Sequence, residues 1–317
     1  METQAKIDSV CGFLLQSPPG EINDVLNDVR NIISDDDTLQ EGVLPALRKY
    51  NLEQFITVDV PGTQHQSIIS ESARIPSSDD DDDGEERWLD PRSKTSFAFN
   101  HLTLVRSRVP PSKSKGPQRL TIDSLQEATD PQPVDPNENS EPLRAALEKS
   151  AITYLTAHFH DGVSSVFASR DTGSVFTLQI VANKYNPTNF WSGRWRSEYI
   201  INMDDNTIKG RISVNVHYYE QGNVQLSTTH TISIPLTSAI VTSPPTNAAS
   251  KIVALIETEE RNYQNSLSDS YHEMSEKTFK SLRRALPLTR QKLDWDKVLG
   301  YKLGAELSSS KGNFGSS

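Results

Sequence analysis

Five segments of alternating apolar and polar residues, separated by turn-forming residues, constrain the fold of this chain more than any other feature. The segments cover residues 163–169, 174–182, 191–203, 207–219 and 224–234. Between them lie Asp171-Thr172-Gly173, Asn186-Pro187, Asp204-Asp205-Asn206 and Gln221-Gly222-Asn223, which are turn-forming sequences. Consecutive strands joined by tight turns predict an antiparallel meander, which leaves at least one edge strand to be covered or shared.

Helical patterns flank this sheet on both sides in the sequence. A helix is expected on residues 140–159, with Ser140 as its N-cap. A long helix is expected on residues 247–286, and at about 1.5 Å per residue it is long enough to cross the sheet. Three short helices are expected in residues 1–56, the third interrupted by Pro45. The predicted fold class is therefore α+β.

The segments between these regions differ in character. Residues 57–104 are mostly strand-like and predict a small strand-rich globule. Within them, residues 77–86 contain five consecutive aspartates, which repel one another and indicate a solvated acidic insertion. Residues 105–139 are rich in Pro, Ser and Lys and are interpreted as an insertion or linker. Residues 308–317 are Ser/Gly-rich and are expected to be a disordered tail.

The strand at residues 191–203 carries an aromatic face and a charged face. With a period of two, Trp191, Trp195 and Tyr199 point to one side of the sheet, while Arg194, Arg196 and Glu198 point to the other. We expect the aromatic side chains to face the covering helix. Bases could in principle stack on such a strand, but the acidic surroundings argue against nucleic acid as a partner.

The C-terminal region is cationic on an acidic protein. Residues 277–302 hold eight basic residues against two aspartates, which gives about +6 on a chain whose net charge is −10. Trp295, Val298, Leu299 and Leu303 fall on one stripe of a helix that begins after Pro287. A short helix with a basic surround and an apolar stripe is suited to an acidic partner that has an apolar groove.

The sequence gives little support to an enzyme. It contains no phosphate loop, no Gly-x-Ser-x-Gly and no His-Glu-x-x-His. His158, His160 and Asp161 cluster where a helix is expected to end, and because no third and fourth ligand is spaced for a metal, a capping role suffices. We therefore expect no catalytic residues, no metal and no cofactor.

Other features bear on location. The single cysteine, Cys11, fits a reducing compartment, and no apolar run approaches the roughly 18 residues that a membrane-spanning helix needs. The N-terminus does not read as a signal peptide. We expect a soluble protein of the cytoplasm that is not transmembrane. A hydrophobic fraction of 35% is low, which indicates either a compact part diluted by solvated segments or a subunit whose core a partner completes.

Three long motifs, in order along the chain, resemble the alpha subunit of F-actin capping protein (the CapZ alpha family). Residues 189–198 read NFWSGRWRSE, residues 217–226 read HYYEQGNVQL, and residues 279–297 read FKSLRRALPLTRQKLDWDK. The shorter motifs LDPRSK at 89–94 and EATDPQP at 127–133 also match. The acidic stretch near 77–86, the segment 103–126 and the tail beyond residue 307 look like insertions or extensions relative to the family.

The resemblance implies a layout and a function. It implies an N-terminal helical stalk at 1–56, a helix plus antiparallel sheet at 140–235, a long helix across the sheet at 247–286, and a mobile amphipathic C-terminal tentacle at 287–307. It implies a heterodimer with a capping protein beta subunit, which binds the barbed ends of actin filaments at the cortical cytoskeleton. Such a heterodimer blocks actin subunit addition and loss in a calcium-independent manner.

The resemblance also implies site residues. The expected actin-binding residues are Lys280, Arg283, Arg284, Arg290, Lys292, Trp295, Lys297, Val298, Leu299 and Lys302. Three of these, Lys280, Arg284 and Arg290, match positions that are linked in the family to the inhibition of capping by phosphoinositides. An alternative remains open: the same basic amphipathic end would also suit a membrane-surface adaptor that binds anionic phosphoinositides.

Overall fold

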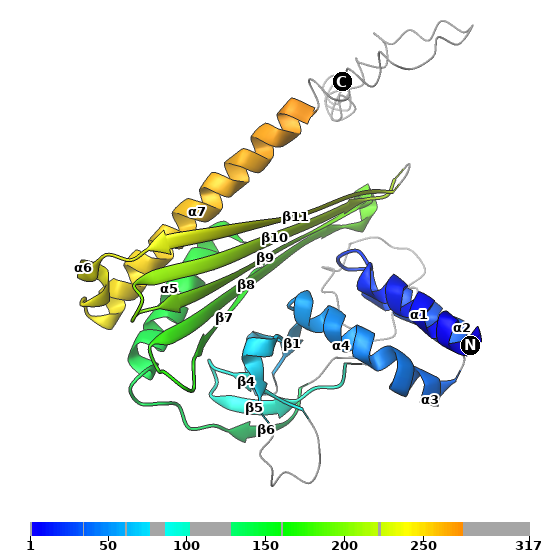
Figure 1. Ribbon diagram of the computed structural model, residues 1–317, viewed down its shortest axis with the longest axis horizontal. Coiled ribbons are helices and arrows are strands. Elements are labelled where there is room, and N and C mark those ends of the chain that lie inside the picture. Colours follow the sequence, from blue (N-terminus) through cyan, green and yellow to red (C-terminus); the bar gives the residue numbers. More distant parts are fainter. Residues whose placement is uncertain are drawn as a thin grey trace, which may run out of the picture. The chain divides into compact units, whose positions relative to one another are not determined.

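The computed structural model describes residues 2–33, 35–60, 62–76, 86–101, 128–159, 161–220 and 223–274. The chain divides into one compact unit, Met1–Tyr263, and a second unit, Gln264–Ser317, whose described part is the end of a helix. Helices and antiparallel sheets together make up the first unit, which confirms the predicted α+β class (Figure 1).

The N-terminal helices pack into a small bundle of their own, here called the stalk. It contains α1 (Glu2–Leu15), α2 (Ile22–Ile33), α3 (Asp36–Thr38), the π-helical turn η1 (Leu39–Val43) and α4 (Leu44–Glu53). Their apolar stripes meet in one cluster, which includes Leu14, Leu26, Val29, Leu47 and Tyr50. Pro45 lies in the first turn of α4, where a backbone N–H has no partner within the helix and a proline is therefore tolerated. The interruption predicted at Pro45 is thus the point at which α4 begins.

Two small antiparallel sheets follow the stalk. The first pairs β1 (Thr57–Asp59) with β2 (Gln66–Ile68). The second has the order β3-β4-β5-β6, with β3 (Arg74–Ile75) after the short helix η2 (Glu71–Ala73), then β4 (Arg87–Asp90), β5 (Thr95–Ala98) and β6 (Thr129–Pro133). Trp88 and Phe97 are fully buried in the core that these sheets share with the end of α4.

Strand β6 corrects the interpretation of residues 105–139 as insertion or linker. Residues 102–127 lie outside the described residues, but Thr129–Pro133 pairs with β5. Pro131 and Pro133 lack the N–H of a ladder hydrogen bond, and the strand lies at the sheet edge, where prolines are tolerated. The high proline content of this segment therefore predicted a linker where residues 129–133 form an edge strand.

The main sheet confirms the predicted meander. Its strands are β7 (Val163–Ala168), β8 (Val175–Asn186), β9 (Trp191–Asn202), β10 (Thr207–Tyr218) and β11 (Val224–Pro235), with the short helix η3 (Pro187–Asn189) between β8 and β9. They pair in sequence order, and every pair is antiparallel. On β10, Gly210 lies against the ring of Tyr199, and a Cβ there would be 2.6 Å from a ring carbon, so no larger residue fits.

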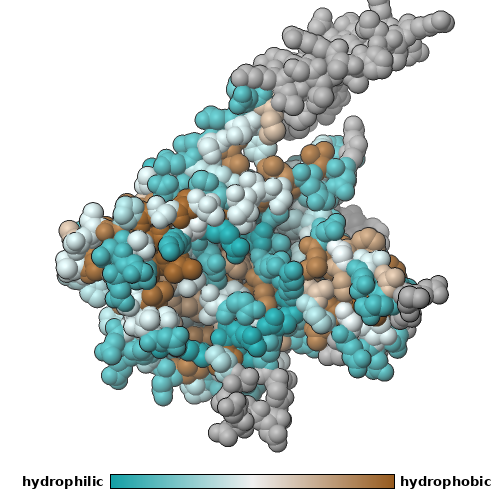
Figure 2. All heavy atoms as spheres, in the orientation of Figure 1, coloured by the Kyte–Doolittle hydropathy of each residue, from teal (hydrophilic) through white to brown (hydrophobic). Residues whose placement is uncertain are grey.

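Two long helices cover one face of this sheet. Helix α5 (Glu141–His158) precedes the sheet, and α7 (Pro245–Glu273) follows it after the short α6 (Ser238–Val241) (Figure 1). The long helix predicted on residues 247–286 is confirmed as far as Glu273, and residues 275–317 lie outside the described residues. Hydrophobic atoms show through a largely hydrophilic surface near α6 and on the stalk helices (Figure 2).

The buried residue His101 gives this fold a pH dependence. It follows β5 and lies against Trp88 and Phe99, with ring centroids 5.6 and 5.0 Å away, and Asn51 Nδ2 is 3.2 Å from its Nδ1. Burial lowers the pKa of this imidazole to about 4, although nearby Glu86 opposes the shift. His101 is therefore neutral in the folded protein at neutral pH.

We expect stability to fall as the pH drops from 6.5 toward 4, because His101 takes up a proton in the unfolded chain but not in the folded one. Between pH 7.5 and pH 5 its contribution to the free energy of unfolding should fall by about 2 kcal/mol. Urea unfolding at the two pH values, for wild type and His101→Leu, measures this. The variant should lose less stability than wild type over that interval; an equal loss would contradict the assignment.

Candidate functional site

The predicted actin-binding residues all lie beyond the last described residue, Met274. They are Lys280, Arg283, Arg284, Arg290, Lys292, Trp295, Lys297, Val298, Leu299 and Lys302, and the three predicted phosphoinositide-binding residues are among them. Helix α7 (Pro245–Glu273) is the last described element before them in the chain.

A single acidic residue fixes α7 to the sheet and to α5. Glu260 has no exposed surface, and its carboxyl oxygens accept hydrogen bonds from three hydroxyl groups. Tyr154 of α5 donates at 2.5 Å, and Ser197 and Tyr199 of β9 donate at 2.7 and 2.6 Å. Burial, and next the negative charge of Glu260, raise the pKa of both tyrosine hydroxyls, which therefore remain protonated donors.

Tyr263 continues this contact at the end of the first unit. Its ring stacks on His230 of β11 with centroids 4.5 Å apart and lies 5.9 Å from Trp195 of β9, and its hydroxyl is 3.2 Å from Thr228 Oγ1. Trp195 and Tyr199 thus face α7, as predicted for the aromatic side of this strand. Trp191 is half-buried on the same side, where Lys184 Nζ lies 5.7 Å from its ring centroid.

The opposite face of the sheet meets the stalk. Arg194 is buried, donates to Asn183 Oδ1 at 2.7 Å and to the Tyr185 hydroxyl at 2.8 Å, and reaches the Gln54 carbonyl at 3.4 Å. Arg196 donates to the Glu53 carbonyl at the end of α4 and to Asn215 Oδ1. The predicted opposition of aromatic and charged faces is confirmed for these residues, but the sequence did not predict that Arg194 would be buried and Arg196 half-buried.

A histidine adds a second link between the sheet and the stalk. His217 of β10 is buried, and its Nδ1 lies 2.6 Å from a carboxyl oxygen of Glu21, just before α2. Its Nε2 lies 3.0 Å from Asn223 Oδ1. Together with Arg194 and Arg196, this contact joins the stalk and the sheet within the first unit.

Strand β11 is an edge of the main sheet in the part of the chain that the structure describes. It pairs with β10 on one side only. Its outward side chains toward the stalk face are Gln225, Ser227, Thr229, Thr231 and Ser233, all exposed, and Val224 is 64% exposed at its start. Its unpaired backbone groups are available to a further strand.

We expected no metal ion at the cluster of His158, His160 and Asp161. His158 ends α5, and its Nε2 lies 3.4 Å from a carboxyl oxygen of Glu257; His160 lies outside the described residues. Where the structure is described, no group of three or more His, Cys, Asp or Glu side chains is arranged to hold a metal ion. No described helix is both long and apolar enough to cross a membrane.

Glu260 is the structural residue that sequence reasoning missed. The sequence does place Glu260 on the apolar face of its helix, which it shares with Ile252, Ile256 and Tyr263. An acidic side chain on the apolar face of a helix needs hydrogen-bond donors from another element. The sequence did not indicate that Tyr154 and Tyr199 would supply them.

Comparison with known proteins gives a consistent result over nearly the whole chain. A family model described as F-actin capping protein alpha subunit matches residues 10–125 and 113–306. An F-actin-capping protein subunit alpha from Emericella nidulans is 35% identical over 307 residues, 96% of this chain and 98% of the relative. The corresponding proteins of Caenorhabditis elegans and Dictyostelium discoideum are 34% and 30% identical over similar spans.

A solved structure supports the fold. The homodimeric actin capping protein alpha subunit from Plasmodium berghei matches with a TM-score of 0.63 at 19% sequence identity. The match covers 90% of this chain and 99% of that one. It supports the arrangement of stalk, sheet and helices described above.

Proposed function

Because this chain belongs to the F-actin capping protein alpha subunit family, we propose that it caps the barbed ends of actin filaments as one half of a heterodimer. The observation that carries the proposal is the family match, which extends over the stalk, the sheet and the basic C-terminal motif. Capping requires no reaction and no calcium ion in this proposal: the bound protein blocks actin subunit addition and loss sterically.

The second subunit in the proposal is a capping protein beta subunit. The open edge of β11 supports this, because a second sheet could extend the main sheet there through backbone hydrogen bonds. The low hydrophobic fraction of 35% is consistent with a core that a partner completes. One-to-one recovery of a second subunit of similar size with this chain would support the heterodimer.

Residues 287–307 are the actin-binding arm in this proposal. Long-range attraction between its cations and acidic actin speeds encounter, and burial of Trp295, Val298 and Leu299 slows release. Anionic phosphoinositide head groups compete for Lys280, Arg284 and Arg290, so that capping is relieved near a lipid surface. The protein would then act on cortical actin in the cytoplasm.

Charge reversal tests the steering step. We expect Arg283→Glu, Arg284→Glu and Arg290→Glu together to slow capping at low salt by about tenfold or more, because residues 277–302 would fall from about +6 to about zero net charge and no longer attract acidic actin. Elongation of pyrene-labelled actin from filament seeds, at several protein concentrations and salt levels, measures the association rate. Dimer formation with the beta subunit should be unchanged.

A matched variant controls for net charge. Lys49→Glu, Lys149→Glu and Arg170→Glu change three exposed cations of the first unit by the same amount. Capping by this variant should remain within about twofold of wild type, because its charges are distant from the arm in sequence. Equal slowing by both triple variants would mean that net charge, not the arm, governs association.

A further inference from the structure

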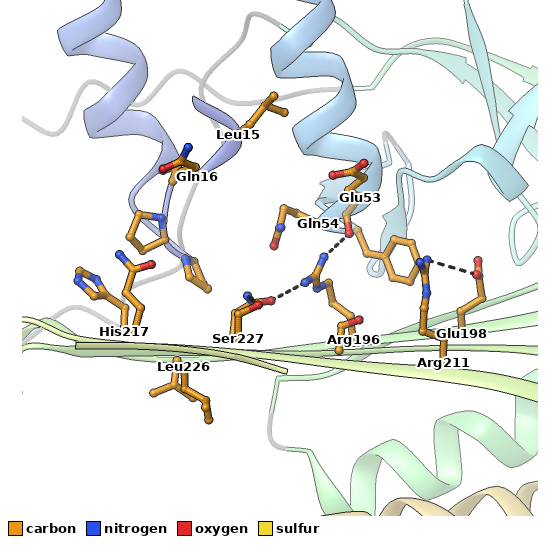
Figure 3. Close-up of a pocket in the computed structure, with 18 residues that line it drawn as sticks. Leu15, Gln16, Glu53, Gln54, Arg196, Glu198, Arg211, His217, Leu226 and Ser227 are labelled. Carbon is orange, nitrogen blue, oxygen red and sulfur yellow. Dashed lines mark hydrogen bonds and ion pairs between the residues drawn. The ribbon is translucent and has the colours of Figure 1, made fainter. Parts of the chain in front are cut away.

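A cleft of about 570 Å³ opens between the sheet and the end of the stalk (Figure 3). Strands β9, β10 and β11 form its floor, which carries Arg196, Arg211, Asn215 and Ser227. The turn after α1 and the end of α4 form its wall, which carries Gln16 and Gln54. The whole cleft lies within the first unit, and it takes no part in the proposed capping mechanism.

Two arginines beside this cleft, the buried Arg194 and the half-buried Arg196, have only neutral hydrogen-bond partners. Arg194 is hydrogen-bonded to amide, hydroxyl and carbonyl oxygens, and Arg196 to a carbonyl and an amide oxygen. The Nε atom of Arg196 is buried without a hydrogen-bond partner. Among the described residues, no carboxylate lies within ion-pair distance of either guanidinium. Buried charges are normally paired, so this pair of cations is unusual.

The cations beside the cleft also repel one another. Burial, followed by the positive charges of Arg194 and Arg211, lowers the pKa of Arg196 to about 10. The side chain of Arg211 is 60% exposed at the cleft, and its Nη2 approaches Glu198 only to 3.8 Å. An anion placed between Arg196 and Arg211 would relieve this repulsion.

None of the acidic residues that line the cleft forms an ion pair with Arg194 or Arg196. The carboxylate of Glu53 points away from the sheet, and Lys49 Nζ lies 3.9 Å from it (Figure 3). Glu198 accepts a hydrogen bond from Gln179 at 2.8 Å and forms a long ion pair of 3.8 Å with the exposed Arg211, so it counters Arg211 and not Arg194 or Arg196. His217 faces Glu21 at 2.6 Å. Among the described residues, neither Arg194 nor Arg196 therefore forms an ion pair, although the charge of Glu53 acts on Arg196 from a distance.

We propose that this cleft is a binding site for the phosphate group of a small molecule. Phosphate presents several acceptor oxygens, and the cleft surrounds it with guanidinium, amide and hydroxyl donors from the sheet and amide donors from the stalk. A volume of about 570 Å³ exceeds the size of phosphate alone and admits a phosphate ester. The ligand bridges stalk and sheet, so its binding stabilises that junction.

A carboxylate introduced into the cleft tests the site. Ser227→Glu places a negative charge beside Asn215, which Arg196 contacts. Ser233→Glu is the matched control, because it makes the same change on the same face of β11, opposite Lys209 and outside the cleft. A second pair, Arg211→Gln against Lys209→Gln, removes one cation inside and one outside the cleft.

The measurement is isothermal titration of inorganic phosphate, at constant ionic strength, into the full chain in complex with its beta subunit. We expect saturable binding that Ser227→Glu and Arg211→Gln each weaken by about tenfold or more, since each alters a charge-assisted contact. The two control variants should stay within about twofold of wild type. Circular dichroism and dimer recovery check that each variant folds.

Three outcomes would overturn the proposal. One is no saturable phosphate binding by the wild-type complex. Another is phosphate binding by the cleft variants that equals binding by the control variants, which would place the phosphate elsewhere, including the basic C-terminal region that all variants share. The third is that acetate binds in the same titration while phosphate does not, which would assign the cleft to carboxylates. Seeded actin elongation is a separate measurement, so failure here leaves the capping proposal untouched.

Discussion

Ending the chain after Ala285 should abolish capping while leaving the stalk and the sheet folded. The deletion removes four of the seven predicted actin-binding cations together with Trp295, Val298 and Leu299, so encounter is weakened and the contacts that slow release are lost. We expect the concentration that halves elongation of seeded filaments to rise at least about 100-fold, equivalent to about 2.7 kcal/mol of binding free energy. The structure supports a folded remainder, because the buried contacts of α7 end at Tyr263.

A shorter deletion provides the control. Ending the chain after Leu307 removes only the Ser/Gly-rich tail and keeps every predicted actin-binding residue. This variant should cap like wild type. If the chain ending at Ala285 still stopped filaments from lengthening at the wild-type dose, the C-terminal arm would not be the actin-binding element, and another surface of the heterodimer would have to carry capping.

Glu260→Leu should be the most destabilising single substitution in the first unit. Three hydroxyl groups donate to Glu260, and with an apolar side chain in its place those of Tyr154, Ser197 and Tyr199 would be buried without this acceptor. Each unsatisfied buried group costs about 1–3 kcal/mol, so we expect a loss of about 4 kcal/mol in the free energy of unfolding. Urea or thermal unfolding of the complex measures the loss.

Two variants sharpen this test. Glu260→Gln keeps a carbonyl acceptor and should recover part of the loss, which distinguishes hydrogen bonding from packing. Glu259→Leu makes the same change at the neighbouring half-buried position, where the side chain faces away from the cluster, and should cost less than about 1 kcal/mol. Similar stabilities for the position 259 and 260 variants would refute a fixing role for Glu260.

The features that could be predicted are those that depend on residues close together in the sequence. The five strands of the main sheet, their turns and the start of the long helix follow from periods of two and 3.6, which depend only on backbone geometry. The two sides of β9 were likewise predictable, because alternation assigns Trp195 and Tyr199 to one face and Arg194 and Arg196 to the other. The family motifs are also local, and they carry the functional assignment.

The tertiary structure decided everything that depends on partners far apart in the chain. Tyr154 and Glu260 are separated by 106 residues, and Arg196 and Glu53 by 143, so no local pattern could pair them. A Pro-rich segment became strand β6 because an open sheet edge tolerates residues that cannot donate. Local residue patterns were enough to predict the main helices, the five strands of the main sheet and the family. Only the packed chain decided which charges are buried, because burial depends on what the rest of the chain places around a side chain.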